Sequence, residues 1–182
     1  SMVRPRAGDF VYSSAEFAEM KRSVVVAKEA GIDGVVLGVL TKEHRVDVER
    51  TRELAELAKP LPVTYHRAFD EAADLHQALE EVIQSGAKRI LTSGGAKSAL
   101  EGAATLAELI EAAGKRIVIV PGAGISSVNI AELARRTRAR EFHSGLSAAL
   151  PYGSGEYRKF EEEVRKLAEQ IARISQIRTT WE

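Results

Sequence analysis

Several short apolar runs of this chain are directly followed by the same few residue types: arginine, histidine, aspartate, serine and glycine. Polar side chains in such positions can gather around a small ligand. The planar forks of arginine fit the oxygens of a carboxylate or phosphate group. Histidine exchanges protons near neutral pH, and glycine lets ligand oxygens approach backbone N–H groups, which attract anions at helix starts. The pattern predicts a site for an anionic or hydroxylated small molecule. Its candidate ligand-binding residues are Arg4, Arg6, Asp9, His66, Arg67, Ser93, Gly94, Gly122, Gly124, His143, Ser144 and Gly145.

Each kind of candidate also has a structural interpretation. The arginines near the N-terminus can form ion pairs within the fold, and glycines that follow strands often only form turns. Asp70 can orient a histidine, but we expect it to cap the next helix or to pair with Arg67. His66 and His143 are predicted to orient a ligand or to form a polar layer rather than to bind a metal.

The composition excludes several classes of partner and cofactor. The 26 basic residues balance 26 acidic ones, so we expect no nucleic-acid partner and no polybasic contact with a membrane. The chain has no cysteine and no His-x-x-x-His or His-Glu-x-x-His spacing, which argues against thiolate and zinc sites. No apolar run approaches the roughly 20 residues that span a bilayer. We expect one soluble, cytoplasmic domain that covers residues 1–182.

Short apolar runs alternate with amphipathic helical segments at near-constant spacing. Such alternation predicts βα units and a parallel sheet that is covered by helices. In a parallel barrel the carboxyl ends of the strands share one mouth, so the candidate residues should meet there. The expected strands cover residues 34–40, 62–66, 89–93, 116–120 and 140–144, and the stub at 4–9 adds to the same mouth.

Local signals mark where helices begin. Two serines are followed three residues later by glutamate, which is capping-box spacing, and two aspartates precede other helical segments. The last helix is expected over residues 154–177, with apolar residues at heptad-like steps. We expect it to pack on the strands, and the alternative is that it also contacts a partner chain. The predicted N-caps are Ser13, Asp47, Asp74 and Ser98.

Several of these segments resemble the CutC family, which is named for copper homeostasis. The resemblance runs from residue 3 to about residue 147 and is most specific over 4–10 and 62–70. It implies a TIM-type barrel and a cytoplasmic protein that associates with itself. The other matching segments are 33–41, 49–52, 89–95 and 141–144.

The chain departs from the family pattern on its N-terminal side, where CutC proteins have further βα units. A closed barrel needs about eight strands. We therefore expect an α/β fold, a partial TIM-type (βα)-barrel of parallel strands alternating with helices that lacks the first two to three strands. Its open edges would favour a homo-oligomer in which copies cover each other. The copper-binding cysteines proposed for some members lie in the earlier region, so copper is suggested here by the family name only.

Three functions stay open. The resemblance favours a CutC-like barrel, linked to copper homeostasis by its family, that binds a small anionic ligand or a metal at the strand ends without established catalysis. The first alternative is an engineered or shortened barrel fragment that serves folding or assembly without activity. The second is a lyase, isomerase or hydrolase in which His66 or His143 acts as base and Arg67 clamps an oxyanion.

Overall fold

Helices and parallel strands alternate along the chain in the computed structural model, which describes residues 1–146 and 157–178. The strands are β1 (Val35–Leu37), β2 (Val63–Tyr65), β3 (Arg89–Thr92) and β4 (Val118–Pro121). The helices are α1 (Ser14–Glu29), α2 (Val48–Ala58), α3 (Leu75–Ser85), α4 (Ala103–Ala113), α5 (Ile130–Thr137) and α6 (Tyr157–Arg178), and η1 (Arg67–Glu71) is a 3-10 helix.

The strands form one parallel, open sheet in the order β1-β2-β3-β4. Val36 lies opposite Thr64, Thr64 opposite Arg89, and Arg89 opposite Val118. Met2 forms a parallel bridge with Val36, so the first residues of the chain extend the sheet beyond β1. This register brings the carboxyl ends of all four strands to one edge, and the predicted parallel α/β fold is confirmed.

The expected strand at residues 140–144 is not formed. His143 N–H donates to the Pro121 carbonyl (2.9 Å), and Glu141 Oε2 pairs with Arg89 Nε (2.7 Å), so the segment lies beside the sheet without joining its ladder. Its sequence carries Phe142 as the one large apolar side chain. A strand is stabilised by side-chain packing on its neighbours, and this run offers little of it.

Most of the predicted helix boundaries are confirmed. Ser13 forms a reciprocal capping box at the start of α1, and the carboxylates of Asp47 and Asp74 accept backbone N–H groups at the starts of α2 and α3. Gly86 ends α3 in the left-handed conformation, which glycine adopts without a Cβ clash.

The expected helix start at Ser98 is wrong. The Ser98 hydroxyl accepts the N–H three residues later, but α4 begins only at Ala103. The reason lies outside the segment. A Cβ on Gly102 would lie 1.9 Å from the Ser93 carbonyl oxygen, so this close approach to the loop after β3 holds residues 98–102 as a turn.

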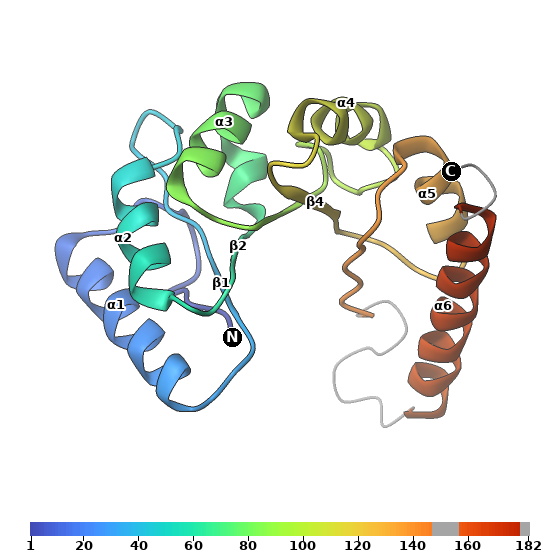
Figure 1. Ribbon diagram of the computed structural model, residues 1–182, viewed down its shortest axis with the longest axis horizontal. Coiled ribbons are helices and arrows are strands. Elements are labelled where there is room, and N and C mark those ends of the chain that lie inside the picture. Colours follow the sequence, from blue (N-terminus) through green and yellow to red (C-terminus); the bar gives the residue numbers. More distant parts are fainter. Residues whose placement is uncertain (147–156, 179–182) are drawn as a thin grey trace.

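The helices lie along the outer side of an arch, with the sheet on its inner side (Figure 1). Alternate strand residues are buried between sheet and helices, while the other face is half-exposed toward the inside of the arch. At the end of the arch α6 packs on α5, and Leu167 of α6 is buried, whereas Val164, another apolar residue of this helix, is exposed. The expected start of this helix at residue 154 lies outside the described residues.

The lengths and polarity of the helices also bear on membrane insertion. Within residues 1–146 and 157–178, none of the helices combines the length and apolar character needed to cross a bilayer.

Candidate functional site

His66 follows β2, and its side chain is buried, with 4% of the residue exposed. Its Nδ1 accepts a hydrogen bond from Ala68 N–H (3.1 Å), while Nε2 has no hydrogen-bond partner in the described part of the chain. The Phe10 ring packs on the imidazole at a centroid distance of 4.9 Å. Burial, assisted by the charge of Arg4, lowers the pKa of His66 to about 4. The ring is therefore neutral near pH 7.

A glycine makes the room that this ring needs. A Cβ on Gly38, just after β1, would lie 2.6 Å from both Cε1 and Nδ1 of His66. A Cβ atom does not approach a non-bonded carbon or nitrogen this closely, so any side chain at position 38 would push the imidazole away. Gly38 and the Phe10 ring together fix the orientation of His66.

Arg4 packs on the Phe10 ring that also covers His66, and its charge acts on a second buried polar group, the hydroxyl of Tyr12. The Arg4 guanidinium stands 4.5 Å from the Phe10 ring centroid, and its Nη2 donates to the Gly8 carbonyl (2.6 Å). The Tyr12 hydroxyl has no partner in the described part of the chain. Burial raises the pKa of Tyr12, and the nearby Arg4 charge opposes that effect. Arg4 is thus a cation shared by two enclosed polar groups.

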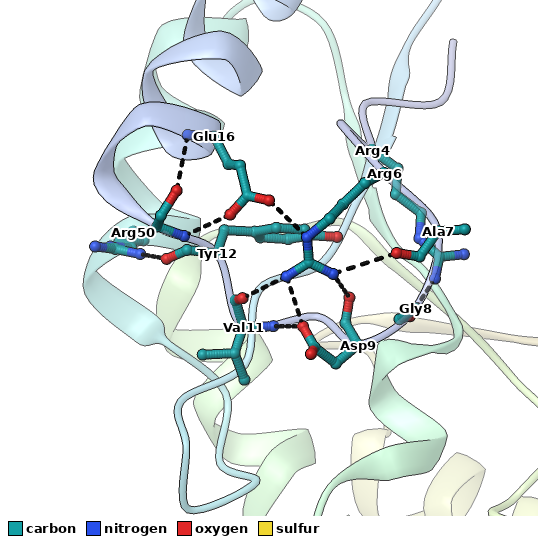
Figure 2. Close-up of polar contacts among 10 residues, drawn as sticks. Arg4, Arg6, Ala7, Gly8, Asp9, Val11, Tyr12, Glu16 and Arg50 are labelled. Atoms are coloured by element: carbon teal, nitrogen blue, oxygen red, sulfur yellow. Dashed lines mark hydrogen bonds and ion pairs between the residues drawn. The ribbon is translucent and has the colours of Figure 1, made fainter.

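Arg6 and Asp9 belong to an ion-pair cluster with Glu16 of α1 (Figure 2). Arg6 Nη2 contacts Asp9 Oδ1 (2.7 Å) and the Val11 carbonyl (2.8 Å), and its Nε contacts Glu16 Oε1. These bonds to Asp9 and Glu16 raise the pKa of Arg6. The Glu16 carboxyl has a lowered pKa because Ser13 N–H and then Arg6 bind it. The arrangement supports the structural interpretation of this arginine, which holds the loop that carries Tyr12.

Arg67 and Ser93 donate to the carboxylate of Asp70, and Gly94 follows Ser93 in the same loop. Asp70 Oδ2 accepts from Arg67 Nε (2.7 Å), and both carboxylate oxygens accept from Ser93 N–H (3.0 and 3.1 Å). Gly95 N–H also donates to Oδ1 (3.0 Å), and Gly94 N–H donates to a threonine hydroxyl (2.9 Å). The backbone groups that the sequence offers to a ligand are here engaged by a carboxylate of the chain itself. Pairing of Asp70 with Arg67, one of the two expected roles, is confirmed.

The loop after β4 holds two further candidates. A Cβ on Gly122 would lie 2.5 Å from Leu91 Cδ1, so this glycine permits close packing over β3. Gly124 has a φ of 69°, and its carbonyl accepts from Asn129 Nδ2 (2.7 Å). Farther along, Glu163 of α6 accepts from the N–H of Ser127 (2.6 Å) and from its hydroxyl (2.8 Å). A carboxylate of the chain again occupies a backbone donor, here in the loop that carries Gly122 and Gly124.

The last three candidates lie on the segment beside β4. His143 is exposed, and its backbone is tied to the end of β4. Ser144 Oγ donates to the Ile125 carbonyl (2.6 Å), which binds the segment to the β4 loop. Gly145 faces open space, since a Cβ there would meet nothing within 4 Å.

The candidates therefore fall into separate groups around one edge of the sheet. Among them, within the described residues, His66 alone keeps a buried polar side-chain atom without a hydrogen-bond partner, and Arg4 packs on the Phe10 ring that covers it. The sequence reasoning missed Tyr12, Phe10 and Gly38. One signal for the two aromatic residues was available in the sequence. Arg4, Arg6, Phe10 and Tyr12 recur at even-numbered positions of the N-terminal segment, which places these long side chains around the same loop.

The donor set does not fit a bound copper ion. Within the described ranges no group of three His, Cys, Asp or Glu side chains could hold a metal, and the chain has no cysteine. His66 uses Nδ1 to accept from Ala68. Soft thiolate or thioether ligands and clustered imidazoles are what copper prefers, and neither is gathered here.

Comparison with known proteins places this geometry in a family. The model of the CutC family matches residues 1–148. This chain belongs to the CutC family. A CutC family protein of Chromobacterium violaceum is 47% identical over 186 residues, covering 100% of this chain and 75% of the relative. Another, from Xanthomonas campestris pv. campestris, is 49% identical over 143 residues, covering 79% of this chain and 60% of the relative.

Solved structures agree with the assignment to CutC. A crystal structure of a CutC copper homeostasis protein from Streptococcus agalactiae matches with a TM-score of 0.75 and 31% identity, over 79% of this chain and 70% of that one. A structure described as native KDPGal matches with a TM-score of 0.59 at 13% identity, which shows a similar fold only. The chain thus spans between 60% and 75% of the length of these CutC relatives.

Proposed function

We propose that this CutC family member binds a small anionic ligand at the carboxyl ends of its strands, on the side where Arg4 and His66 meet. One observation carries the proposal: the buried Nε2 of His66 has no hydrogen-bond partner in the described residues, and Arg4 packs on the Phe10 ring that covers this imidazole. A buried polar atom without a partner costs about 1–3 kcal/mol, and a ligand oxygen would remove that cost.

Arg4 is the group that makes an anion the favoured ligand. Arg4 is exposed to solvent, and its hydrogen bond to the Gly8 carbonyl uses only Nη2 of the guanidinium. Arg67 and Arg6 have carboxylate partners within the chain, so they compete less well for an external anion. The streptococcal relative is named for copper homeostasis. For this chain we propose such a role only in a form in which these residues do not bind copper directly.

Isothermal titration of the full chain with inorganic phosphate tests the proposal. Arg4→Gln should weaken binding about tenfold, the ratio for about 1.4 kcal/mol. Arg22→Gln is the matched control, because Arg22 is an exposed arginine on α1 away from His66. The proposal fails if neither phosphate nor acetate binds more tightly than about 1 mM, or if the control weakens binding as much as Arg4→Gln does.

We also propose that copies of the chain associate through the open edges of the sheet. The open sheet supports this, since Met2, which bridges β1, and Val26 of α1 near it expose apolar side chains, and Val118 does so on β4. Unpaired strand edges and apolar surface both favour association. Light scattering should show an oligomer that Val26→Lys weakens, while Val128→Lys, at an exposed loop position, does not. A stable monomer of the unaltered chain would contradict the proposal.

A further inference from the structure

The hydrogen bonding of His66 determines which of its nitrogens carries the proton. Ala68 N–H donates to Nδ1, and an N–H group can donate only to a ring nitrogen that has no proton of its own. A neutral imidazole then carries its proton on Nε2, which is the buried nitrogen without a partner in the described residues. His66 therefore presents an N–H donor, not a lone pair, to its surroundings.

The neighbours of His66 make this orientation hard to change. Gly38 backs the Nδ1 and Cε1 side of the ring, the Phe10 ring packs at 4.9 Å, and the Tyr65 ring stands edge-on at 6.2 Å. Freeing Nδ1 would leave the Ala68 N–H buried without an acceptor. The pKa of about 4 agrees with a ring that stays neutral in this enclosure.

The hydroxyl of Tyr12 is the second enclosed group without a partner in the described residues. Only 4% of Tyr12 is exposed, and Arg4 acts on its pKa as it does on that of His66. Its backbone is held in place, because the Tyr12 carbonyl accepts from Arg50 Nη1 (2.6 Å) and the Arg6 guanidinium lies over its ring (5.3 Å). In Figure 2 the ring reaches from its own loop toward the segment that carries Arg4 and Arg6.

We propose that Arg4, Tyr12 and His66 form a donor site for one oxyanion group, a carboxylate or a phosphate, and that the same arrangement refuses metal cations. The guanidinium supplies charge and N–H donors, the Nε2–H supplies a directed donor, and the Tyr12 hydroxyl donates a third. An acceptor-only group satisfies all three, whereas a metal ion would need a lone pair that Nε2 does not have. The inference rests on the proposed anion binding and adds Tyr12, the ligand class and the exclusion of copper at His66.

Nitrogen-15 correlation spectra of the imidazole rings in the full chain test the proton position before any ligand is added. The His66 signals are assigned by their loss in His66→Gln. We expect the Nε2–H form near pH 7, with Nδ1 at the shift of an unprotonated, hydrogen-bonded nitrogen. A proton on Nδ1 would overturn the donor site while leaving anion binding through Arg4 to be judged by calorimetry.

Titrations with sodium acetate and with inorganic phosphate, at constant ionic strength, then test the ligand class. Either anion should shift the Nε2 signal of His66 saturably, and comparison of the two distinguishes a carboxylate from a phosphate ligand. Tyr12→Phe should weaken binding about tenfold, as expected for loss of one hydrogen bond of about 1.4 kcal/mol. Tyr157→Phe, an exposed tyrosine on α6, is the matched control and should leave affinity unchanged.

Each remaining result has a defined meaning. If Nε2 carries the proton but neither anion shifts its signal, the proposed function and this inference both fail. Arg4, Tyr12 and His66 then stabilise the fold and do not bind a ligand. If an anion binds but Tyr12→Phe does not weaken it, Tyr12 is not a ligand group and the inference is wrong. A saturable shift of His66 Nε2 on addition of Zn²⁺, used as a diamagnetic probe, would refute the exclusion of metal cations.

Discussion

Replacing His66 by glutamine should remove a large part of the acid sensitivity of the fold. Burial and the Arg4 charge lower the pKa of His66 from 6.5 to about 4. As the pH falls, the unfolded chain therefore binds a proton before the folded chain does. Stability rises with pH wherever the unfolded state binds more protons, so this group's contribution is complete above pH 6.5 and is lost on the way down to about pH 4.

The size of the effect follows from the two pKa values. At about 1.4 kcal/mol per pKa unit, the difference amounts to about 3 kcal/mol once the pH is below the folded value. About 2 kcal/mol of this should already be lost at about pH 5. Losses of this size are a large share of the roughly 5–15 kcal/mol that stabilises a domain.

Urea unfolding followed by circular dichroism, at a series of pH values, measures the effect as a difference between proteins. The free energy of unfolding of the unaltered chain should fall more steeply between about pH 7 and pH 5 than that of His66→Gln, by about 2 kcal/mol. His76→Gln is the matched control, because its imidazole is exposed on α3, and this variant should follow the unaltered chain. Parallel curves for the unaltered chain and His66→Gln, within about 0.5 kcal/mol, would refute the reasoning.

Three further substitutions test the polar and packing contacts. Asp70→Asn should lower the free energy of unfolding, measured in urea titrations, by about 3 kcal/mol. The reason is that a nearly buried carboxylate, which accepts from several donors, is replaced by an amide with one acceptor oxygen. A loss below about 1 kcal/mol would contradict this. Gly38→Ala should cost about 1–3 kcal/mol and shift the ring signals of His66, since the new Cβ meets the imidazole; unchanged spectra would contradict it. Glu163→Gln should weaken the docking of α6 by about 1 kcal/mol and speed amide exchange at Ser127, whereas unchanged exchange would show that this contact does not hold the helix.

Local sequence signals determined the alternation of strands and helices. The apolar runs at β1 to β4 marked the strands, and the caps at Ser13, Asp47 and Asp74 act within three residues of themselves. Such signals can be read without knowing the fold, because every atom involved is near in the sequence. The family resemblance rested on the same segments, and the family comparison confirms it.

Tertiary structure alone decided where the strand pattern ends and which polar groups are left for a ligand. The segment at 140–144 stays outside the sheet, and α4 starts late because Gly102 packs on the loop after β3. The N–H group of Ser93 is used by Asp70, 23 residues earlier, and that of Ser127 by Glu163, 36 residues later. The Nε2 of His66 and the hydroxyl of Tyr12 stay without hydrogen-bond partners in the described residues because distant residues enclose them. Hydrogen bonds between remote residues depend on how the elements pack, and that is information that no local run of sequence contains.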